Sequence, residues 1–254
     1  MPSTELPPIV DLRAVANDLV GRSGLERLVS MINRVARIQS CIGDLKEAHD
    51  CCVAIAETVA GNVLGAPEVL EMLRASALVR AITLYERAVN AASKRGERGS
   101  FAIREQLSEA ERVDHDALVA VRNRALAHVH VGDDIEGETW HRSLFFAVRH
   151  PQGWAPASAS ERVHFHREAF DRCCRALPVA SAILEARCHT EMEKLIDALS
   201  AARLPDADFL PHRIDPAQAF GSLEVAREIV AAWGPEGAAF LHSRTMPTSK
   251  PEPG

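Results

Sequence analysis

The stretch VRNRALAHVH, from Val121 to His130, has the spacing of a helix with one apolar face. At about 100° per residue, Arg122 falls within the apolar stripe of this helix rather than opposite it. The stripe consists of Leu118, Val121, Ala125, Leu126 and Val129, which recur at steps of three and four residues. Because an unpaired buried charge is very costly, Arg122 must find a partner, and this makes it the first candidate site residue.

The rest of the chain also favours helices, since alanine and leucine are abundant and aromatic residues make up only 5% of 254 residues. One segment differs: TWHRSLFFAVRHPQGW, residues 139–154, is rich in β-formers and predicts a strand or small hairpin. Helical patterns are expected at 11–63, with breaks near Gly21–Gly24 and Gly43, and at 67–94 and 101–112. The helix that carries Val121–His130 follows, capped by Asp114 or Asp116. Further helical patterns are expected at 161–203, with a kink or break at Pro178, and at 216–233.

The order of these elements predicts an all-α fold, an antiparallel helical bundle with a small β-hairpin insertion and a C-terminal extension. We expect the bundle to comprise residues 1–203. Residues 204–254 should form a linker, a short helix and a disordered tail, because their composition shifts to proline and polar residues. The last helical stretch, with Trp233 and Phe240 near it, either docks on the bundle or on another chain.

Charge and cysteine usage limit the classes of function. The formal net charge is −6, so any contact with nucleic acid must be local and rest on clustered arginines. The six cysteines include no C-x-x-C pair, which favours free thiols in a reducing cytoplasm. We expect neither a signal peptide nor a membrane-spanning helix, because no apolar run reaches about 18 residues.

The segment RNRALAH, Arg122 to His128, resembles the signature of HEPN domains, which are helical ribonucleases and related modules of prokaryotic defence and toxin systems. The family pattern is an arginine, usually followed by a polar residue, and then a histidine; Arg122, Asn123 and His128 fill these positions. The run ALAHVH is similar to the abortive-infection branch. The preceding LVRAITLYERAVNAA resembles the helix that packs on the signature helix, so the resemblance covers about residues 67–200.

The resemblance implies a metal-independent endoribonuclease, usually a homodimer whose signature helices face each other. It implies an RNA substrate and a cognate antitoxin or regulator. Some members carry a tyrosine two positions after the histidine, which a partner enzyme modifies. His130 occupies that position here, which argues against this form of control.

The residue types also suit this chemistry without the resemblance. Metal-independent RNA cleavage needs a base for the 2′-hydroxyl proton, an acid for the leaving oxygen and a cation for the phosphorane. His128 has a side chain that titrates near cellular pH, and Arg122 offers a planar fork of donors to phosphate oxygens. Asn123 would orient the phosphate or hold the arginine.

Ideal helix geometry leaves the choice of arginine open. Arg122 and His128 are six positions apart, so they point about 120° apart and lie about 9 Å apart along the axis. Arg124 stands four residues before His128 and is the better geometric partner. Either both side chains bend toward a cleft at a dimer interface, or Arg124 contacts phosphate and Arg122 is structural. We rank Arg122 first, on the resemblance.

A non-catalytic alternative is a helical scaffold for dimerisation or protein binding that uses Arg122 as an interface anchor. Arg122 could also have a structural role, paired with a carboxylate such as Glu86. Glu86 lies at the edge of a polar stripe, which favours a solvated position; Glu86, Arg124 and His130 are weaker candidates for substrate binding. We expect no metal and no cofactor. Three pairs of potential ligands lack the spacing of a zinc site: His128 with His130, His164 with His166, and Asp133 with Asp134. The cysteines of the segments HDCC and RCC lie in helical patterns that are typical of core packing.

Overall fold

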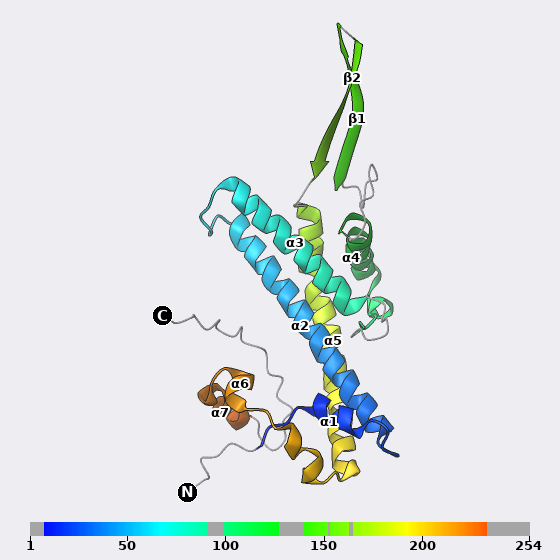
Figure 1. The fold of residues 1–254 in the computed structure, drawn as a ribbon, viewed down its shortest axis with the longest axis vertical. Coiled ribbons are helices and arrows are strands. Elements are labelled where there is room, and N and C mark those ends of the chain that lie inside the picture. Colours follow the sequence, from blue (N-terminus) through cyan, green and yellow to red (C-terminus); the bar gives the residue numbers. More distant parts are fainter. Residues whose placement is uncertain (1–7, 91–98, 127–139, 152, 163–164, 233–254) are drawn as a thin grey trace. The chain divides into compact units, whose positions relative to one another are not determined.

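The computed structural model describes residues 8–90, 99–126, 140–151, 153–162 and 165–232 (Figure 1). Within these ranges the chain is mostly helical and carries a two-stranded antiparallel sheet, which confirms the predicted fold class. Its main elements are α1 (Leu12–Leu19), α2 (Glu26–Val59), α3 (Pro67–Val89), α4 (Glu109–Ala120), β1 (His141–His150), β2 (Gly153–Arg162), α5 (Arg167–Ala202), α6 (Pro216–Phe220) and α7 (Leu223–Ala232).

Side-chain caps and special backbone positions fix several helix ends. Asp11 accepts the backbone N–H groups of Arg13 and Ala14 and begins α1. Pro67 occupies the first turn of α3, where its missing N–H costs nothing. After α2 the chain turns at Gly61, whose φ of 78° favours glycine.

The chain forms two compact units: residues 1–36 with 190–254 form the first unit, and residues 37–189 form the second. The core of the second unit comes from α2, α3, α4 and α5. Figure 1 shows α3 running back alongside α2 after the short connection at 60–66. The largest fully buried side chains of this core are Ile38, Leu45, Ile55, Leu78, Ile82, Tyr85, Ile103, Leu118 and Leu177.

The first unit has a separate apolar cluster. Its fully buried members come from α1, the start of α2 and the end of α5: Val15, Ala16, Leu19, Leu28, Ile32, Val35 and Leu195. A short antiparallel bridge between Val10 and Arg213 joins the segment before α1 to the segment before α6. The Asp11 N–H donates to the His212 carbonyl at 2.9 Å and extends this bridge.

The hairpin of β1 and β2 confirms the predicted β segment and extends it. Phe145 pairs with Ser158, and Arg149 pairs with Trp154. The sequence predicted a helix from about residue 161, but β2 continues to Arg162. The serines and alanines of β2 have little strand preference of their own, so hydrogen bonding to β1 decides their conformation.

The predicted break at Gly43 is wrong, the break at Gly21–Gly24 is confirmed, and of the kink or break predicted at Pro178 the break is wrong. Helix α2 runs through Gly43, and α5 runs through Pro178. Buried neighbours such as Leu45 and Leu177 hold these helices in the core and outweigh the local cost of glycine or proline. The break at Gly21–Gly24 is present, and both glycines have a φ above 80°.

Three further boundaries differ from the prediction. No α-helix covers 101–112: a 3₁₀ turn at Arg104–Gln106 precedes α4, which begins at Glu109. The predicted helix at 216–233 is two helices, because Gly221 adopts a φ of 79° between them. The helix predicted to reach Lys94 ends at Val89, and Lys94 lies outside the described residues.

None of the helices in the described part of the chain has the length and apolarity that a bilayer span requires.

Candidate functional site

Helix α4 directly precedes the signature segment, and a capping box fixes the start of this helix. The Ser108 hydroxyl accepts the Glu111 N–H at 3.4 Å, while the Glu111 carboxylate accepts the Ser108 N–H at 2.7 Å. The predicted caps, Asp114 and Asp116, are therefore wrong, because both lie inside the helix. The buried side chains of His115, Leu118 and Val121 set which face of α4 meets the core.

The signature begins where the α-helix stops. From Val121 to Leu126 the backbone is π-helical, which widens the turn relative to an α-helix. Such turns are rare and occur frequently at functional sites, although packing alone also produces them. The ideal α-helical angle between Arg122 and later residues therefore does not apply here.

Arg122 is held by two side chains. Its Nε atom lies 3.4 Å from Glu86 Oε2 on α3, and its Nη1 atom donates to Asn123 Oδ1 at 2.9 Å. Asn90 donates from Nδ2 to the other oxygen of Glu86 at 3.4 Å. A carboxylate of α3 and an amide of the π-helical segment thus orient one guanidinium group.

The two side chains of this ion pair are buried to different extents. The Glu86 side chain is 6% exposed, whereas that of Arg122 is 36% exposed. The expectation that Glu86 faces solvent is therefore wrong, and the predicted pairing of Arg122 with Glu86 is present. A buried carboxylate needs its cation, so Glu86 holds the arginine, while about a third of the Arg122 side chain remains exposed.

This arrangement is suited to anion binding. Glu86 lies beside Nε, and Asn123 accepts a hydrogen bond from Nη1. An arginine offers several donors in one plane, so a phosphate can bind those that Glu86 and Asn123 leave over.

The remaining predicted site residues fall into two groups. Arg124 lies half-buried in the same π-helical segment. His128 and His130 lie outside the described residues, as do His164, Asp133 and Asp134. The structure thus brings together Arg122, Asn123 and Glu86 of the predicted set.

A buried polar pair next to this cluster was not predicted from the sequence. The Tyr85 hydroxyl and His115 Nδ1 lie 2.9 Å apart, and both residues are almost fully buried. Burial lowers the pKa of His115 and raises that of Tyr85, so the pair is neutral near pH 7. The available signal was spacing: His115 precedes Arg122 by two helical turns, and Tyr85 is the neighbour of Glu86.

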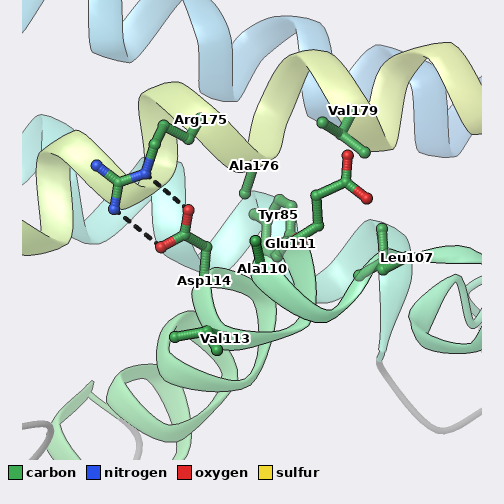
Figure 2. Close-up of a pocket in the computed structure, with 9 residues that line it drawn as sticks. All are labelled: Tyr85, Leu107, Ala110, Glu111, Val113, Asp114, Arg175, Ala176 and Val179. Atoms are coloured by element: carbon green, nitrogen blue, oxygen red, sulfur yellow. Dashed lines mark hydrogen bonds and ion pairs between the residues drawn. The ribbon is translucent and has the colours of Figure 1, made fainter.

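Figure 2 shows a pocket of about 580 Å³ between α3, α4 and α5. Tyr85, Leu107, Ala110, Glu111, Val113, Asp114, Arg175, Ala176 and Val179 line it. Its charged groups are already engaged, since Glu111 closes the capping box and Asp114 binds Arg175. The pocket therefore offers mainly apolar surface.

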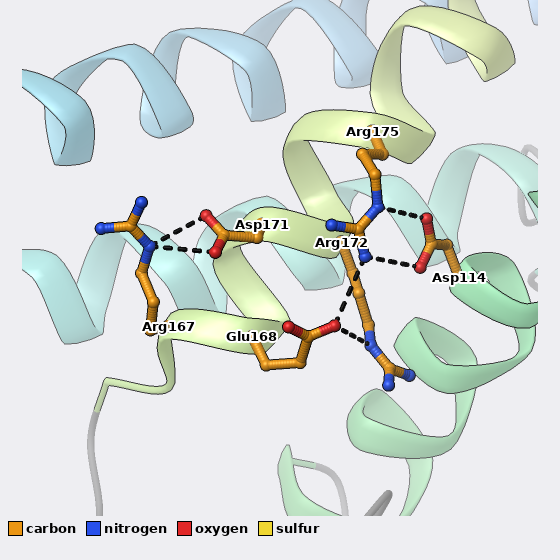
Figure 3. Close-up of polar contacts among 6 residues, drawn as sticks. All are labelled: Asp114, Arg167, Glu168, Asp171, Arg172 and Arg175. Carbon is orange, nitrogen blue, oxygen red and sulfur yellow. Dashed lines mark hydrogen bonds and ion pairs between the residues drawn. The ribbon is translucent and has the colours of Figure 1, made fainter.

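Three arginines and three carboxylates form a balanced network at the start of α5, as Figure 3 shows. Arg175 reaches across to α4 and binds both oxygens of Asp114, at 2.7 and 2.9 Å. Arg172 binds Glu168 at 3.0 Å, and its hydrogen bond lowers the pKa of that carboxyl group. Arg167 pairs with Asp171 one turn along the helix. Each charge in this network has a partner, which indicates a structural role.

The cysteines follow the predicted core pattern for the most part. Cys41, Cys52, Cys173 and Cys188 are buried, Cys51 is half-buried and Cys174 is exposed. The sequence placed the cysteines of RCC in the core, and for Cys174 that is wrong. Among the residues that the structure describes, no group of three or more histidine, cysteine or acidic side chains is placed to hold a metal ion.

No protein-family model matches the chain, and no curated protein or solved structure is significantly similar to it.

Proposed function

We propose that the chain is a HEPN-like, metal-independent endoribonuclease that acts in a toxin or antiphage defence system. The observation that supports this proposal most directly is the partly exposed side chain of Arg122, oriented by buried Glu86 and by Asn123.

In the proposed reaction the ribose 2′-oxygen attacks the adjacent phosphorus. His128 acts as general base or acid: as a base it takes the 2′-hydroxyl proton, and as an acid it protonates the leaving 5′-oxygen. Arg122 binds the non-bridging oxygens as negative charge builds on them. The P–O5′ bond breaks, and the products are a 2′,3′-cyclic phosphate and a 5′-hydroxyl.

A homodimer would supply the second member of the acid–base pair, because each chain contributes one Arg122 and one His128. The proposed partners are therefore a second copy of the chain, an RNA substrate and a cognate antitoxin or regulator. We place this activity in the cytoplasm.

The test is cleavage of single-stranded RNA by purified protein in EDTA. We expect Arg122→Ala and His128→Ala each to lower the rate by about 10²- to 10⁴-fold. Arg104→Ala is the matched control, because Arg104 is an exposed arginine that pairs with Asp116 outside the cluster. This control should keep the wild-type rate.

Arg122→Gln keeps most of the side-chain packing and serves as a second variant if alanine destabilises the fold. Folded Arg122 and His128 variants that both cleave at the wild-type rate would rule out the proposal.

The scaffold alternative has an observation of its own, the exposed apolar surface of the hairpin. Phe145 is 83% exposed and Trp154 is 67% exposed, on a two-stranded sheet. Exposed apolar strands are typical of surfaces that pair with another chain. In this alternative the partner is a second copy of the chain, bound through the hairpin.

Sedimentation of wild type and of a Phe145→Ser, Trp154→Ser double variant separates the two functions. The scaffold requires a dimer that the double variant weakens, without RNA cleavage by the wild type. Leu64→Ser is the control, because Leu64 is 95% exposed in the connection between α2 and α3.

A further inference from the structure

Two arginines in the second unit contact one buried aromatic ring. The guanidinium carbon of Arg37 on α2 lies 4.4 Å from the ring centroid of Phe101, and that of Arg187 on α5 lies 4.6 Å from it. Phe101 itself is 4% exposed. Two positive charges are thus held against the same apolar surface.

The backbone around Phe101 is fixed, so this arrangement is built into the fold. The Phe101 N–H donates to the Ala88 carbonyl at 3.1 Å, just before the end of α3. The Cys41 thiol contacts the Gly99 carbonyl at 3.9 Å, which ties the same segment to α2. Phe101 therefore sits at a defined place among α2, α3 and α5.

Neither arginine has an acidic partner among the described residues. Both are half-buried, and the Nε atom of Arg37 is buried without a hydrogen-bond acceptor. The ring face attracts cations, but it does not accept the hydrogen bonds that guanidinium groups require. Arg87 and Arg175 of the same unit, by contrast, each bind a carboxylate.

We propose that Arg37 and Arg187 form a binding site for a terminal phosphate, a phosphomonoester or inorganic phosphate. This inference is independent of the proposed nuclease activity. The two guanidinium carbons lie within 4.6 Å of one ring centroid and are therefore at most about 9 Å apart, which places both charges in reach of one anion at their accessible ends. A phosphate dianion balances the two charges, whereas a carboxylate or a phosphodiester balances one.

The ligand chemistry has two sources, a free small phosphate and the 5′-phosphate end of an RNA. Calorimetric titration of the full chain distinguishes them with three probes: inorganic phosphate, adenosine 5′-monophosphate, and one RNA oligonucleotide with either a 5′-phosphate or a 5′-hydroxyl. Binding of the first two assigns the site to small phosphates. Binding only of the 5′-phosphorylated RNA assigns it to an RNA end.

Substitution separates a phosphate site from a merely structural pair. We expect Arg37→Gln and Arg187→Gln each to weaken binding of the phosphate probe at least about tenfold, because each removes charge-assisted hydrogen bonds. Arg104→Gln is the control and should bind like the wild type, since Arg104 is exposed and paired with Asp116.

The unfolding temperature without phosphate gives a second measurement, in which the variants should not lose stability even though they lose phosphate binding. Each glutamine variant should unfold at a temperature equal to or above that of the wild type, because it removes repulsion between two cations. Phosphate should then stabilise the wild type more than either variant.

The proposal fails if the wild type binds none of the probes at about 1 mM, where even a weak site would be half-occupied. It also fails if Arg37→Gln and Arg187→Gln bind as tightly as the wild type. Arg37→Lys, which keeps the charge and most of the packing, decides the matter if a glutamine variant does not fold.

Discussion

The arginines of the second unit lie in two contrasting surroundings. At the start of α5, Arg167, Arg172 and Arg175 each bind a carboxylate, and the network is balanced. Against Phe101, Arg37 and Arg187 have no acidic partner among the described residues. The comparison teaches that the partner of an arginine, rather than its burial alone, separates a structural charge from one that awaits a ligand.

Arg122 combines features of both surroundings. It has a carboxylate partner, like Arg175, yet Glu86 is far more buried than the arginine that it holds. We therefore group Arg122 with Arg37 and Arg187, the arginines for which we propose a ligand, and the α5 network with the structural arginines. The following predictions test that division.

The largest expected effect comes from the carboxylate that pairs with Arg122. Glu86→Gln keeps the shape but removes the charge that orients the guanidinium, so RNA cleavage should fall by about 10- to 100-fold. The measurement is the initial cleavage rate of the folded variant. An unchanged rate would place Arg122 with the structural arginines.

The neutral pair beside Glu86 should affect stability more than activity. Tyr85→Phe removes the hydroxyl that lies 2.9 Å from His115 and leaves a buried ring nitrogen unpaired. We expect the free energy of unfolding to fall by about 1–2 kcal/mol. Urea denaturation measures this, and a loss below about 0.3 kcal/mol would mean that the hydrogen bond contributes nothing.

The same pair predicts a dependence of stability on pH. Burial lowers the folded-state pKa of His115 below its ordinary value of 6.5, so the unfolded chain binds this proton first as the pH falls. The contribution of His115 to stability is therefore complete above pH 6.5 and decreases below it, down to the folded pKa. Unfolding of wild type and His115→Gln at pH 7 and pH 5 should show a smaller decrease for the variant. Equal decreases would contradict the burial effect.

The smallest effect should come from the balanced network. Asp114→Asn removes a partner of Arg175, whose side chain is 53% exposed, so solvent screens much of the interaction. We expect a loss of about 0.5 kcal/mol in the free energy of unfolding and no change in RNA cleavage. A large loss of cleavage would mean that this network belongs to the site.

Local sequence patterns predicted most of the fold, because apolar spacing reports which face of a helix is buried. The helices do not break at Gly43, where a break was expected, or at Pro178, where a kink or a break was expected, and the reason is tertiary: neighbours packed in the core stabilise a continuous helix beyond its local preference. The length of β2 was also missed, since its conformation depends on pairing with β1.

The candidate site was predicted in part. A charge within an apolar stripe singled out Arg122 as a residue that needs a partner, and its pairing with Glu86 was one of the predicted alternatives. The burial of Glu86 and the bond between Tyr85 and His115 join α3 to α4, and no spacing within one helix reveals such contacts. The π-helical turn at Val121–Leu126 was likewise outside the reach of a pattern based on α-helical periodicity.

The most direct test of the central claim is the chemical identity of the RNA ends that the purified chain produces in EDTA. The proposed mechanism predicts 2′,3′-cyclic phosphate and 5′-hydroxyl ends, absent from reactions with Arg122→Ala or His128→Ala. Products with 3′-hydroxyl and 5′-phosphate ends, or intact RNA with the wild-type chain, would contradict it.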